Sequence, residues 1–404
     1  MVGKPTIRLK ISKQMKRYGN LYEKVCDLDN LRLAYRKARK GKGNRYGVKL
    51  FDRDIEGNLL ALQKELRDKT YKTSEYSVFT IYEPKEREIS RLPFRDRVVH
   101  HAIMNILEPI WVGIFSRDTY SCIKKRGIHG AARAVKKDLA RDPEGTLFCL
   151  KGDCKKYYPS VDHDKMKEIV RRKIKDKDLL WLIDGIIDSA PGIPIGNYLS
   201  QYLANLYLAY FDHDIKILFG LRDNPKASEA YYRRYAEIRS GGKPFDEIPE
   251  EGREEALIAW RKILSDGIKH YYRYADDWVI LHSDKSFLAL LLEFIGLYFG
   301  RELKLEIKKN WQIYPVEVRG IDFVGYVFRH THTRMRKGIK RRFFRKVSRI
   351  LKKDPNVTQK TLIHTVCSYY GWALYCNGRN LLRTIFNKLD NEIKLRLPKT
   401  VRIS

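Results

Sequence analysis

Cysteine is scarce in this chain of 404 residues, and its pattern excludes two classes of small stabilised domain. The six cysteines form no CxxC pair and no spacing typical of zinc ligands, so neither a zinc-binding module nor a disulfide framework is expected. They stand at Cys26, Cys122, Cys149, Cys154, Cys367 and Cys376. We expect reduced thiols, as in cytoplasmic proteins.

Long apolar stretches are also missing. No run of about 18 apolar residues occurs, which predicts that no segment spans a membrane. The first residues, Met1–Pro5, contain no apolar signal region. The sequence therefore predicts a soluble, cytoplasmic protein with no membrane partner.

Positive charge is what the chain has in excess. It carries 81 Lys and Arg against 49 Asp and Glu, a formal net charge of +32, while 43% apolar and 12% aromatic residues indicate a folded protein. Such a charge attracts polyanions, and nucleic acid is the expected partner. The alternative is a ribosome-associated or merely very soluble basic protein. An anionic membrane surface is disfavoured because no basic amphipathic helix dominates the sequence.

Hydrophobic periodicity predicts an alternation of helices with a few short strands. Residues 1–75 are basic and mostly helical in pattern, and 222–266 is a charged insertion between core elements. The other predicted helices are 96–112, 162–174, 179–187, 200–211 and 287–299. The predicted strands are a hairpin over 76–92, a strand ending near 150 and a strand–turn–strand over 270–281.

Two adjacent aspartates, Asp276 and Asp277, stand where two β-rich runs meet. Adjacent carboxylates in an apolar hairpin repel each other and lose hydration, so a divalent cation would stabilise them. An ordinary solvated Asp-Asp turn is the alternative reading of the dipeptide alone. The predicted strand at 147–150 leads to a third carboxylate, Asp153, just beyond a buried segment.

Three carboxylates at two strand ends can form an oxygen cage for Mg²⁺. Two such ions suit phosphoryl transfer, because one activates the attacking hydroxyl and the other stabilises the leaving pyrophosphate. Tyr158 lies five residues past Asp153 and can pack under the sugar of a bound nucleotide, or it can be a plain core residue.

The motifs around these aspartates resemble those of reverse transcriptases. Asp153 with Tyr158-Pro159-Ser160 is similar to motif A, and Tyr274-Ala275-Asp276-Asp277 is similar to motif C. Four further stretches resemble family motifs and follow in the expected order over roughly residues 80–330: Arg91–His100 and Tyr120–Ala131 in the fingers, Lys308–Gln312 as motif D, and Gly320–Tyr326 as the primer grip of motif E.

The resemblance implies a role for each matching residue. Asp153, Asp276 and Asp277 would be catalytic and would hold two Mg²⁺ ions, with Mn²⁺ as a substitute. Further residues are expected at the incoming dNTP or at the primer and template. The nucleotide set is Tyr158 as steric gate, Ile195, Gly196, Gln201, Lys85, Arg87, Arg91 and Lys308, and the primer and template set is Gly320, Phe323, Gly325, Tyr326, Arg341, Arg342 and Arg345.

The fourth motif departs from the common family pattern. Most reverse transcriptases carry Gln-Gly there, whereas this chain has Ile195-Gly196 followed by Ser200-Gln201. That pattern is similar to enzymes of diversity-generating retroelements, which copy a template RNA with errors at adenines for mutagenic retrohoming. An aliphatic side chain in place of an amide removes a hydrogen-bond donor and acceptor from the nucleotide pocket. Discrimination between nucleotides would then depend more on shape, and apolar pockets separate molecules of nearly equal shape by only about 1–3 kcal/mol. The alternative is a harmless packing substitution.

The segment 334–353 carries eleven Lys or Arg among twenty residues, interleaved with apolar positions. Apolar residues would form a small helical core while the cations follow the phosphates of a duplex. The expected fold is α+β, a right hand with fingers, an antiparallel palm and a helical thumb. The expected boundaries are 1–145 for N-terminal helices and fingers, 146–333 for the palm (with part of the fingers near 165–200 and the insertion at 222–266) and 334–404 for the thumb.

The resemblance also implies partners and an origin. These are a template RNA, the RNA–cDNA duplex, dNTPs and a small basic accessory protein, in a bacterial or phage-encoded cytoplasmic enzyme. A group II intron-like or defence-associated bacterial reverse transcriptase is the alternative within the class. A non-catalytic RNA-binding protein on a polymerase scaffold is the alternative from another class.

Overall fold

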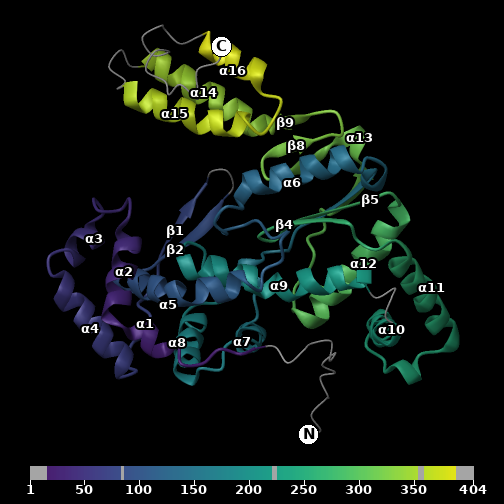
Figure 1. Ribbon diagram of the computed structural model, residues 1–404, viewed down its shortest axis with the longest axis horizontal. Coiled ribbons are helices and arrows are strands. Elements are labelled where there is room, and N and C mark those ends of the chain that lie inside the picture. Colours follow the sequence, from purple (N-terminus) through teal and green to yellow (C-terminus); the bar gives the residue numbers. More distant parts are fainter. Residues whose placement is uncertain (1–15, 83–85, 221–224, 354–358, 388–404) are drawn as a thin grey trace. The chain divides into compact units, whose positions relative to one another are not determined.

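The computed structural model describes residues 16–82, 86–220, 225–353 and 359–387 (Figure 1). The chain divides into two compact units. The first comprises Met1–Cys122, Asp153–Gly267 and Leu290–Lys309, and the second comprises Ile123–Gly152, Ile268–Ala289 and Asn310–Ser404. The chain therefore passes between the units several times. One crossing falls at the peptide bond between Gly152 and Asp153.

The first unit begins with a group of helices around a buried apolar core. The helices are α1 (Tyr22–Cys26), α2 (Leu28–Arg39), α3 (Tyr46–Phe51), α4 (Ile55–Arg67) and α5 (Phe94–Val112). Asp27 and Asp54 cap α2 and α4, because each carboxylate accepts a hydrogen bond from a backbone N–H of the first turn. Leu31, Leu59 and Leu62 are buried on the inner faces. The helical character predicted for residues 1–75 is confirmed from residue 22 to residue 67, while residues 1–15 lie outside the described residues.

A two-stranded hairpin follows these first helices. Strands β1 (Ser77–Ile81) and β2 (Arg87–Arg91) pair antiparallel, which confirms the hairpin predicted over 76–92. Val78 and Phe79 are adjacent, so they point to opposite faces, and both are exposed. The hairpin therefore offers apolar surface on each face. Lys85 lies outside the described residues.

Three helices confirm the elements predicted over 162–211, with shifted boundaries. They are α7 (His163–Arg171), α8 (Lys177–Ile187) and α9 (Tyr198–Gly220). Asp162 and Asp176 cap α7 and α8. Helix α9 continues well beyond the predicted end at Phe211, because its core-facing residues repeat as far as Ile215.

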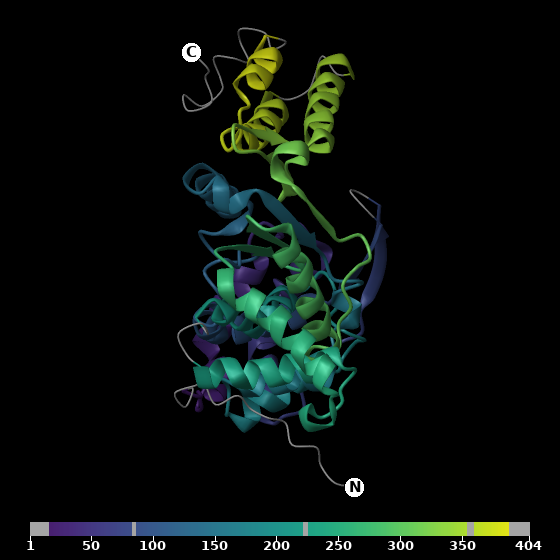
Figure 2. The same cartoon turned by 90° about the vertical axis from the view of Figure 1, so that its right-hand side faces the viewer.

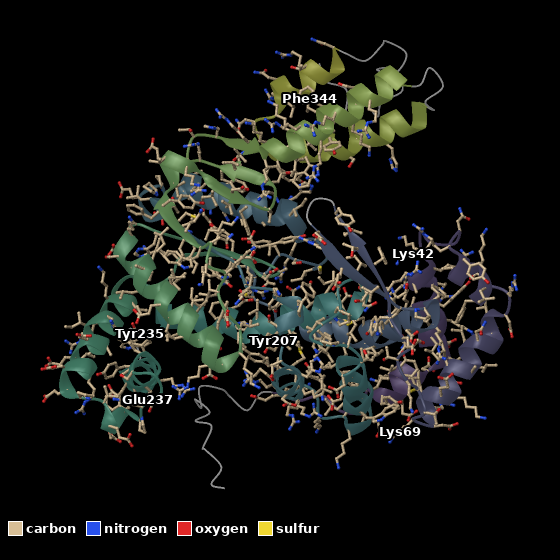
Figure 3. The ribbon with its side chains drawn as sticks, turned by 180° about the vertical axis from the view of Figure 1, so that it is seen from behind. Lys42, Lys69, Tyr207, Tyr235, Glu237 and Phe344 are labelled. Atoms are coloured by element: carbon tan, nitrogen blue, oxygen red, sulfur yellow. The ribbon has the colours of Figure 1, made fainter. Side chains whose placement is uncertain are left out.

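The charged insertion is helical and lies in the first unit. It forms α10 (Pro225–Arg239) and α11 (Glu250–Asp266), which pack against each other. Tyr235 of α10, labelled in Figure 3, lies with its ring 5.7 Å from that of Trp260 and 6.1 Å from that of Phe294. Phe294 belongs to α12 (Lys285–Glu302), so aromatic packing fixes the insertion to a core helix.

The second unit is built on a four-stranded antiparallel sheet with strand order β4-β5-β3-β6, of which Figure 1 labels β4 and β5. Its strands are β3 (Phe148–Gly152), β4 (His270–Tyr274), β5 (Asp277–His282) and β6 (Gln312–Pro315). Helix α6 (Gly127–Arg141) packs on β4. Leu150, Val279 and Ile280 are fully buried, as expected of a central strand pair. The predicted strand–turn–strand over 270–281 is confirmed.

A smaller sheet and a helical group complete the second unit. Helix α13 (Val316–Arg319) leads to the three-stranded sheet of β7 (Ile321–Phe323), β8 (Tyr326–Phe328) and β9 (Thr333–Met335). The last helices are α14 (Lys337–Lys353), α15 (Gln359–Ala373) and α16 (Arg379–Phe386), and they lie side by side in both views (Figures 1 and 2). Ile339, Phe343 and Val347 of α14 are buried in their shared core.

Helices and antiparallel sheets together confirm the predicted α+β class. The basic segment 334–353 is an amphipathic helix over most of its length, with Arg341, Arg342 and Arg345 exposed. The division into fingers, palm and thumb stays a prediction. No helix within the described ranges is long and apolar enough to cross a membrane.

Candidate active site

The turn between β4 and β5 carries the acidic pair. Tyr274 pairs with Asp277, so Ala275 and Asp276 form a two-residue turn. Ala275 has φ of 56°, a left-handed conformation that costs an alanine about 1 kcal/mol. The guanidinium of Arg273 is fully buried and donates a hydrogen bond of 2.7 Å to the Ala275 carbonyl oxygen. A buried cation thus stabilises the strained turn that presents Asp276.

Strand β3 is aligned with this turn by its register. Gly152, the last residue of β3, pairs with Trp278 of β5. Asp153 directly follows Gly152, and Asp277 directly precedes Trp278 on the side of the turn. A Cβ atom at Gly152 would overlap the Trp278 ring, which explains the glycine at this position. Asp153, Asp276 and Asp277 are all partly exposed residues, although the Oδ1 atom of Asp277 is buried.

The chemistry of these side chains fits Mg²⁺, which binds carboxylates while keeping water or substrate phosphate in its coordination shell. Among the residues that the structure describes, no group of three or more His, Cys, Asp or Glu side chains is arranged to hold a metal ion by itself. The described side chains therefore do not form a closed set of protein ligands around a metal ion. Coordination by Asp153, Asp276 and Asp277 stays a prediction.

The loop after α12 lies along the segment that follows Asp153. The Lys308 backbone N–H donates to the Asp153 carbonyl oxygen at 2.8 Å, and the Lys308 Nζ lies 3.9 Å from the Asp153 Oδ2. Cys154 and Ile307 form an antiparallel bridge, and Lys155 pairs with Glu306 at 2.6 Å. The structure thus brings together Asp153 and Lys308, which motif order alone does not place in contact.

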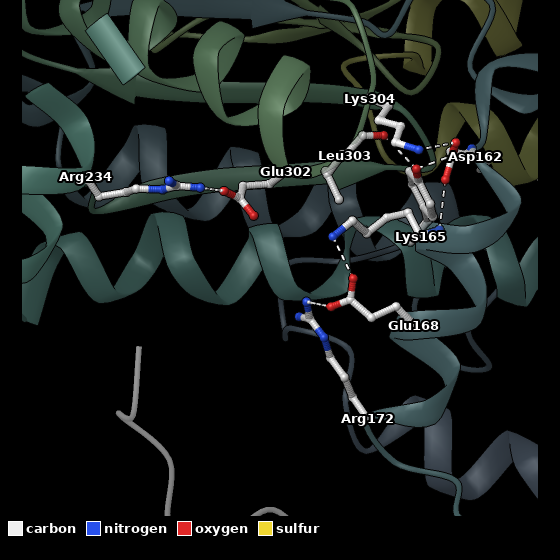
Figure 4. A network of polar contacts seen from close by, with 9 residues as sticks. Asp162, Lys165, Glu168, Arg172, Arg234, Glu302, Leu303 and Lys304 are labelled. Atoms are coloured by element: carbon white, nitrogen blue, oxygen red, sulfur yellow. Dashed lines mark hydrogen bonds and ion pairs between the residues drawn. The ribbon is translucent and has the colours of Figure 1, made fainter. Parts of the chain in front are cut away.

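A polar network fixes the start of this loop (Figure 4). Lys304 pairs with Asp162, the cap of α7, at 2.6 Å, and the Tyr207 hydroxyl donates to the Leu303 carbonyl oxygen at 2.6 Å. Burial of Asp162 acts to raise its pKa. The hydrogen bonds from Lys304 and from the Lys165 backbone N–H outweigh this effect, so the pKa of Asp162 is lowered. Sequence reasoning missed this network, since no motif marks it.

Backbone hydrogen bonds connect the segments of three predicted nucleotide residues of the first unit, Tyr158, Ile195 and Gly196. The Tyr158 carbonyl oxygen accepts a hydrogen bond from the Ile193 N–H at 2.8 Å, and the Ile195 carbonyl oxygen accepts one from the Ser90 N–H of β2, also at 2.8 Å. Gly196 has φ of 122°, and a Cβ there would lie 3.0 Å from the Ser90 carbonyl oxygen. The Ile195–Gly196 loop is therefore held between Tyr158 and the hairpin.

The remaining members of that set differ in position. Arg87 and Arg91 lie exposed on β2, the strand that contacts the Ile195–Gly196 loop. Gln201 lies exposed in the first turns of α9. The hairpin therefore carries cations beside the loop, as expected for a site that binds a triphosphate.

The second unit contains a pocket of about 450 Å³ beside the acidic turn. Tyr274, Asp277 and Gly325 contribute to its lining. Three cations also line it: Arg336, just before α14, and Arg342 and Lys346 within α14. A carboxylate thus faces a volume lined by three cations. Such a pocket suits a phosphate chain whose end lies near the carboxylate.

Of the predicted primer-grip residues, Gly325 lines this pocket. Gly320 and Gly325 have φ of 75° and 89°, conformations that favour glycine, while Phe323 and Tyr326 are buried. The Tyr326 hydroxyl donates to the Trp372 carbonyl oxygen of α15 at 3.0 Å. Arg342 lines the pocket, whereas Arg341 and Arg345 are exposed elsewhere on α14 and are not among its lining residues.

Comparisons with known proteins identify several similar proteins, among them a group II intron-encoded protein and an intron maturase. The chain is 23% identical over 344 residues to the group II intron-encoded protein LtrA of Lactococcus lactis subsp. cremoris, covering 77% of this chain and 57% of LtrA. It is 27% identical over 268 residues to protein YkfC of Escherichia coli (strain K12), covering 61% of this chain and 65% of YkfC. Nuclear intron maturase 1 of Arabidopsis thaliana is 32% identical over 91 residues, 22% of this chain and 12% of that protein.

No family model matches the chain. Among solved structures, apo telomerase from Candida tropicalis aligns with a TM-score of 0.42 and 11% identity over 74% of this chain and 53% of that one, and we draw nothing from so distant a likeness. The chain spans 57% to 65% of the length of the two bacterial relatives. Together with the acidic turn of the antiparallel sheet, these relatives support the predicted class, that of the reverse transcriptases.

Proposed function

We propose that the chain is an RNA-directed DNA polymerase that makes cDNA from a template RNA. The observation that carries this proposal is the register of the four-stranded sheet. It aligns the strand leading to Asp153 with the turn that presents Asp276 and Asp277. The carboxylate of Asp277 lies at a strand end and lines a pocket with three cations, which supports phosphoryl transfer, a reaction that needs carboxylates for metal ions and cations for phosphates.

Asp153, Asp276 and Asp277 would hold two divalent ions, Mg²⁺ in the first place and Mn²⁺ as a substitute. Bound there, the ions would supply the Lewis acidity that activates a primer 3′-hydroxyl and neutralises the leaving pyrophosphate. Lys308, whose backbone N–H donates to the Asp153 carbonyl oxygen, would donate a proton to that leaving group. Arg87, Arg91 and Lys85 of the hairpin region would bind the triphosphate.

Tyr158 would act as the gate that rejects a ribose 2′-hydroxyl. In support, the Tyr158 carbonyl oxygen accepts a hydrogen bond from Ile193, two residues before Ile195 of the same predicted pocket. Ile195, Gly196 and Gln201 would complete the nucleotide pocket. The primer end would lie along Gly320–Tyr326, and the exposed cations of α14 would follow the phosphates of the RNA–cDNA duplex.

Within this class, the proposed subtype is the enzyme of a diversity-generating retroelement, which errs at template adenines during mutagenic retrohoming. The support is Ile195, an aliphatic residue in the loop held between Tyr158 and the hairpin. Such an enzyme would act in the cytoplasm with a structured template RNA and a small basic accessory protein. A second candidate is a group II intron-like reverse transcriptase, because the similar protein LtrA is encoded by a group II intron, and it fits the comparisons no better than the first.

Primer extension tests the proposal. Purified protein would be supplied with an RNA template, a primer, Mg²⁺ and dNTPs, and the products sequenced alongside those of Asp276→Ala. Synthesis that the variant loses, with errors concentrated at template adenines, is the expected result. Faithful synthesis would favour the group II-like candidate. Lack of synthesis with template RNA and accessory partner supplied would favour a non-catalytic RNA-binding protein.

A further inference from the structure

Lys151 occupies an unusual position in the four-stranded sheet. It belongs to β3, two residues before Asp153, and its side chain is mostly covered, with 25% exposed. Its Nζ lies 3.7 Å from the Asp277 Oδ1 and donates a hydrogen bond to the Asp322 carbonyl oxygen of β7. One ammonium group therefore contacts both the acidic turn and the hairpin predicted to hold the primer.

Asp322 extends this contact toward the basic helix α14. Its carboxylate accepts a hydrogen bond of 2.6 Å from the Arg336 Nε, and the Arg336 backbone N–H donates to the Gly325 carbonyl oxygen at 2.9 Å. The chain of contacts thus runs from Asp277 through Lys151 and Asp322 to Arg336. Asp277, Gly325 and Arg336 all line the 450 Å³ pocket.

The two sheets that Lys151 connects do not pair with each other. Strand β3 pairs with β5 and β6, whereas β7 pairs with β8 in the smaller sheet. No strand ladder therefore fixes the distance between Asp277 and the β7–β8 hairpin. An ammonium group has three donors and no acceptor, so it can bond a carboxylate and a carbonyl oxygen at once.

We propose that Lys151 is a positioning residue that sets the place of a primer 3′ end relative to Asp277. The inference rests on the proposed polymerase function and adds a residue that no motif of the sequence indicated. A nucleophile misplaced by about 1 Å costs about 100-fold in rate. A link between the primer-holding hairpin and the acidic turn is thus expected to act on the chemical step more than on duplex affinity.

The test uses the full chain with Lys151→Met, which keeps an unbranched side chain of nearly the same length and removes the charge, and Lys151→Arg, which keeps the charge and changes its shape. Lys167→Met is the matched control, because Lys167 also pairs with a carboxylate, that of Asp188 at 2.6 Å, but belongs to the first unit. Two quantities would be measured. One is the rate of single-nucleotide incorporation, and the other is the fluorescence of 2-aminopurine at the primer terminus in the complex without metal.

Positioning predicts that Lys151→Met lowers the incorporation rate by about 10- to 100-fold, with duplex affinity within about twofold of wild type. It also predicts altered terminal fluorescence and only partial rescue by arginine. Full rescue by arginine would overturn the proposal in favour of simple charge neutralisation, and a matching loss of duplex affinity would overturn it in favour of a binding role. Unchanged rate and fluorescence would contradict it outright.

Two further results separate the possible failures. If wild type extends no primer, the polymerase proposal fails, while the metal-free fluorescence still reports whether Lys151 places the primer end. If Lys151→Met does not fold, Arg336→Gln takes its place. Arg336 is 42% exposed in its side chain and bonds the same Asp322, so it is expected to shift the terminal fluorescence in the same direction. An unshifted signal in that variant would contradict the proposal.

Discussion

The guanidinium of Arg273 donates a hydrogen bond of 2.7 Å to the carbonyl oxygen of Ala275, the residue with positive φ in the turn that presents Asp276. The side chain of Arg273 is fully buried in β4. Burying a cation is costly unless its donors are satisfied, so the turn and the arginine stabilise each other. The shape of the acidic turn therefore depends on Arg273, a residue of β4 outside the turn.

Arg273→Met is expected to lower the free energy of unfolding by about 1–3 kcal/mol, because it leaves turn carbonyl groups without their buried donor. Urea unfolding of the purified variant measures the loss. Arg67→Met, at an exposed arginine in the last turn of α4, is the control and should change stability by less than about 0.5 kcal/mol. Equal effects of the two substitutions would show that Arg273 has no special role.

His270 gives the second unit a pH dependence. Burial opposes its charging, but hydrogen bonds and charge from Asp138 and Asp142 outweigh this and raise the pKa of His270 above its ordinary 6.5. A raised folded-state pKa stabilises the protein below the unfolded value, and this stabilisation is lost as pH rises through the folded value. The Asp142 pKa is lowered, first by its hydrogen bond to His270, so its own contribution is lost only in acid.

We therefore expect His270→Asn to destabilise the protein more at about pH 6 than at about pH 9. Urea unfolding of wild type and variant at both values measures the difference. His364→Asn, at an exposed histidine of α15, is the control and should show no such trend. A pH-independent difference would mean that His270 acts by packing alone.

Tyr158 is expected to control sugar selection. Tyr158→Ala should raise the use of ribonucleotides relative to dNTPs by about 10- to 200-fold, the range that one steric contact provides. Tyr158→Phe keeps the ring and should keep the selection. The measurement is kcat/KM for a matched rNTP and dNTP with each variant. Unchanged selection in Tyr158→Ala would assign Tyr158 to the core.

Ile195 is expected to influence fidelity. Ile195→Gln restores an amide in the loop held by Ser90, and it should reduce misincorporation opposite template adenine. Sequencing of cDNA made by wild type and variant on one RNA template measures the error spectrum. Identical spectra would make Ile195 a packing substitution and remove the main support for the retroelement subtype.

The parts of the fold that could be predicted were those fixed by neighbours in sequence. The β4–β5 hairpin follows from alternation across a short turn, and α14 follows from its apolar spacing between cations. The carboxylates were found because motif order marks them. Their local environment was not found, because Lys151 and Asp322 are 171 residues apart and no pattern links them.

The same reason explains the missed network around Lys304. Its contact with Asp162 joins residues 142 positions apart, and a lysine among 81 cations carries no signal of its own. The fully buried Arg273 could have been suspected, because it lies between two aromatic residues, Tyr272 and Tyr274, in a predicted strand. Alternation would have placed it on one face, but only the turn geometry identifies its acceptor.

The most direct test is the rate of single-nucleotide incorporation on an RNA template, measured for wild type, Asp276→Asn and Asp246→Asn. Asp246 is an exposed residue of the insertion and controls for loss of one charge. Loss of an ion-binding carboxylate should lower the rate by about 100- to 1000-fold in Asp276→Asn, while Asp246→Asn stays near wild type. Equal rates for wild type and Asp276→Asn would contradict the assignment of the acidic turn as the catalytic centre.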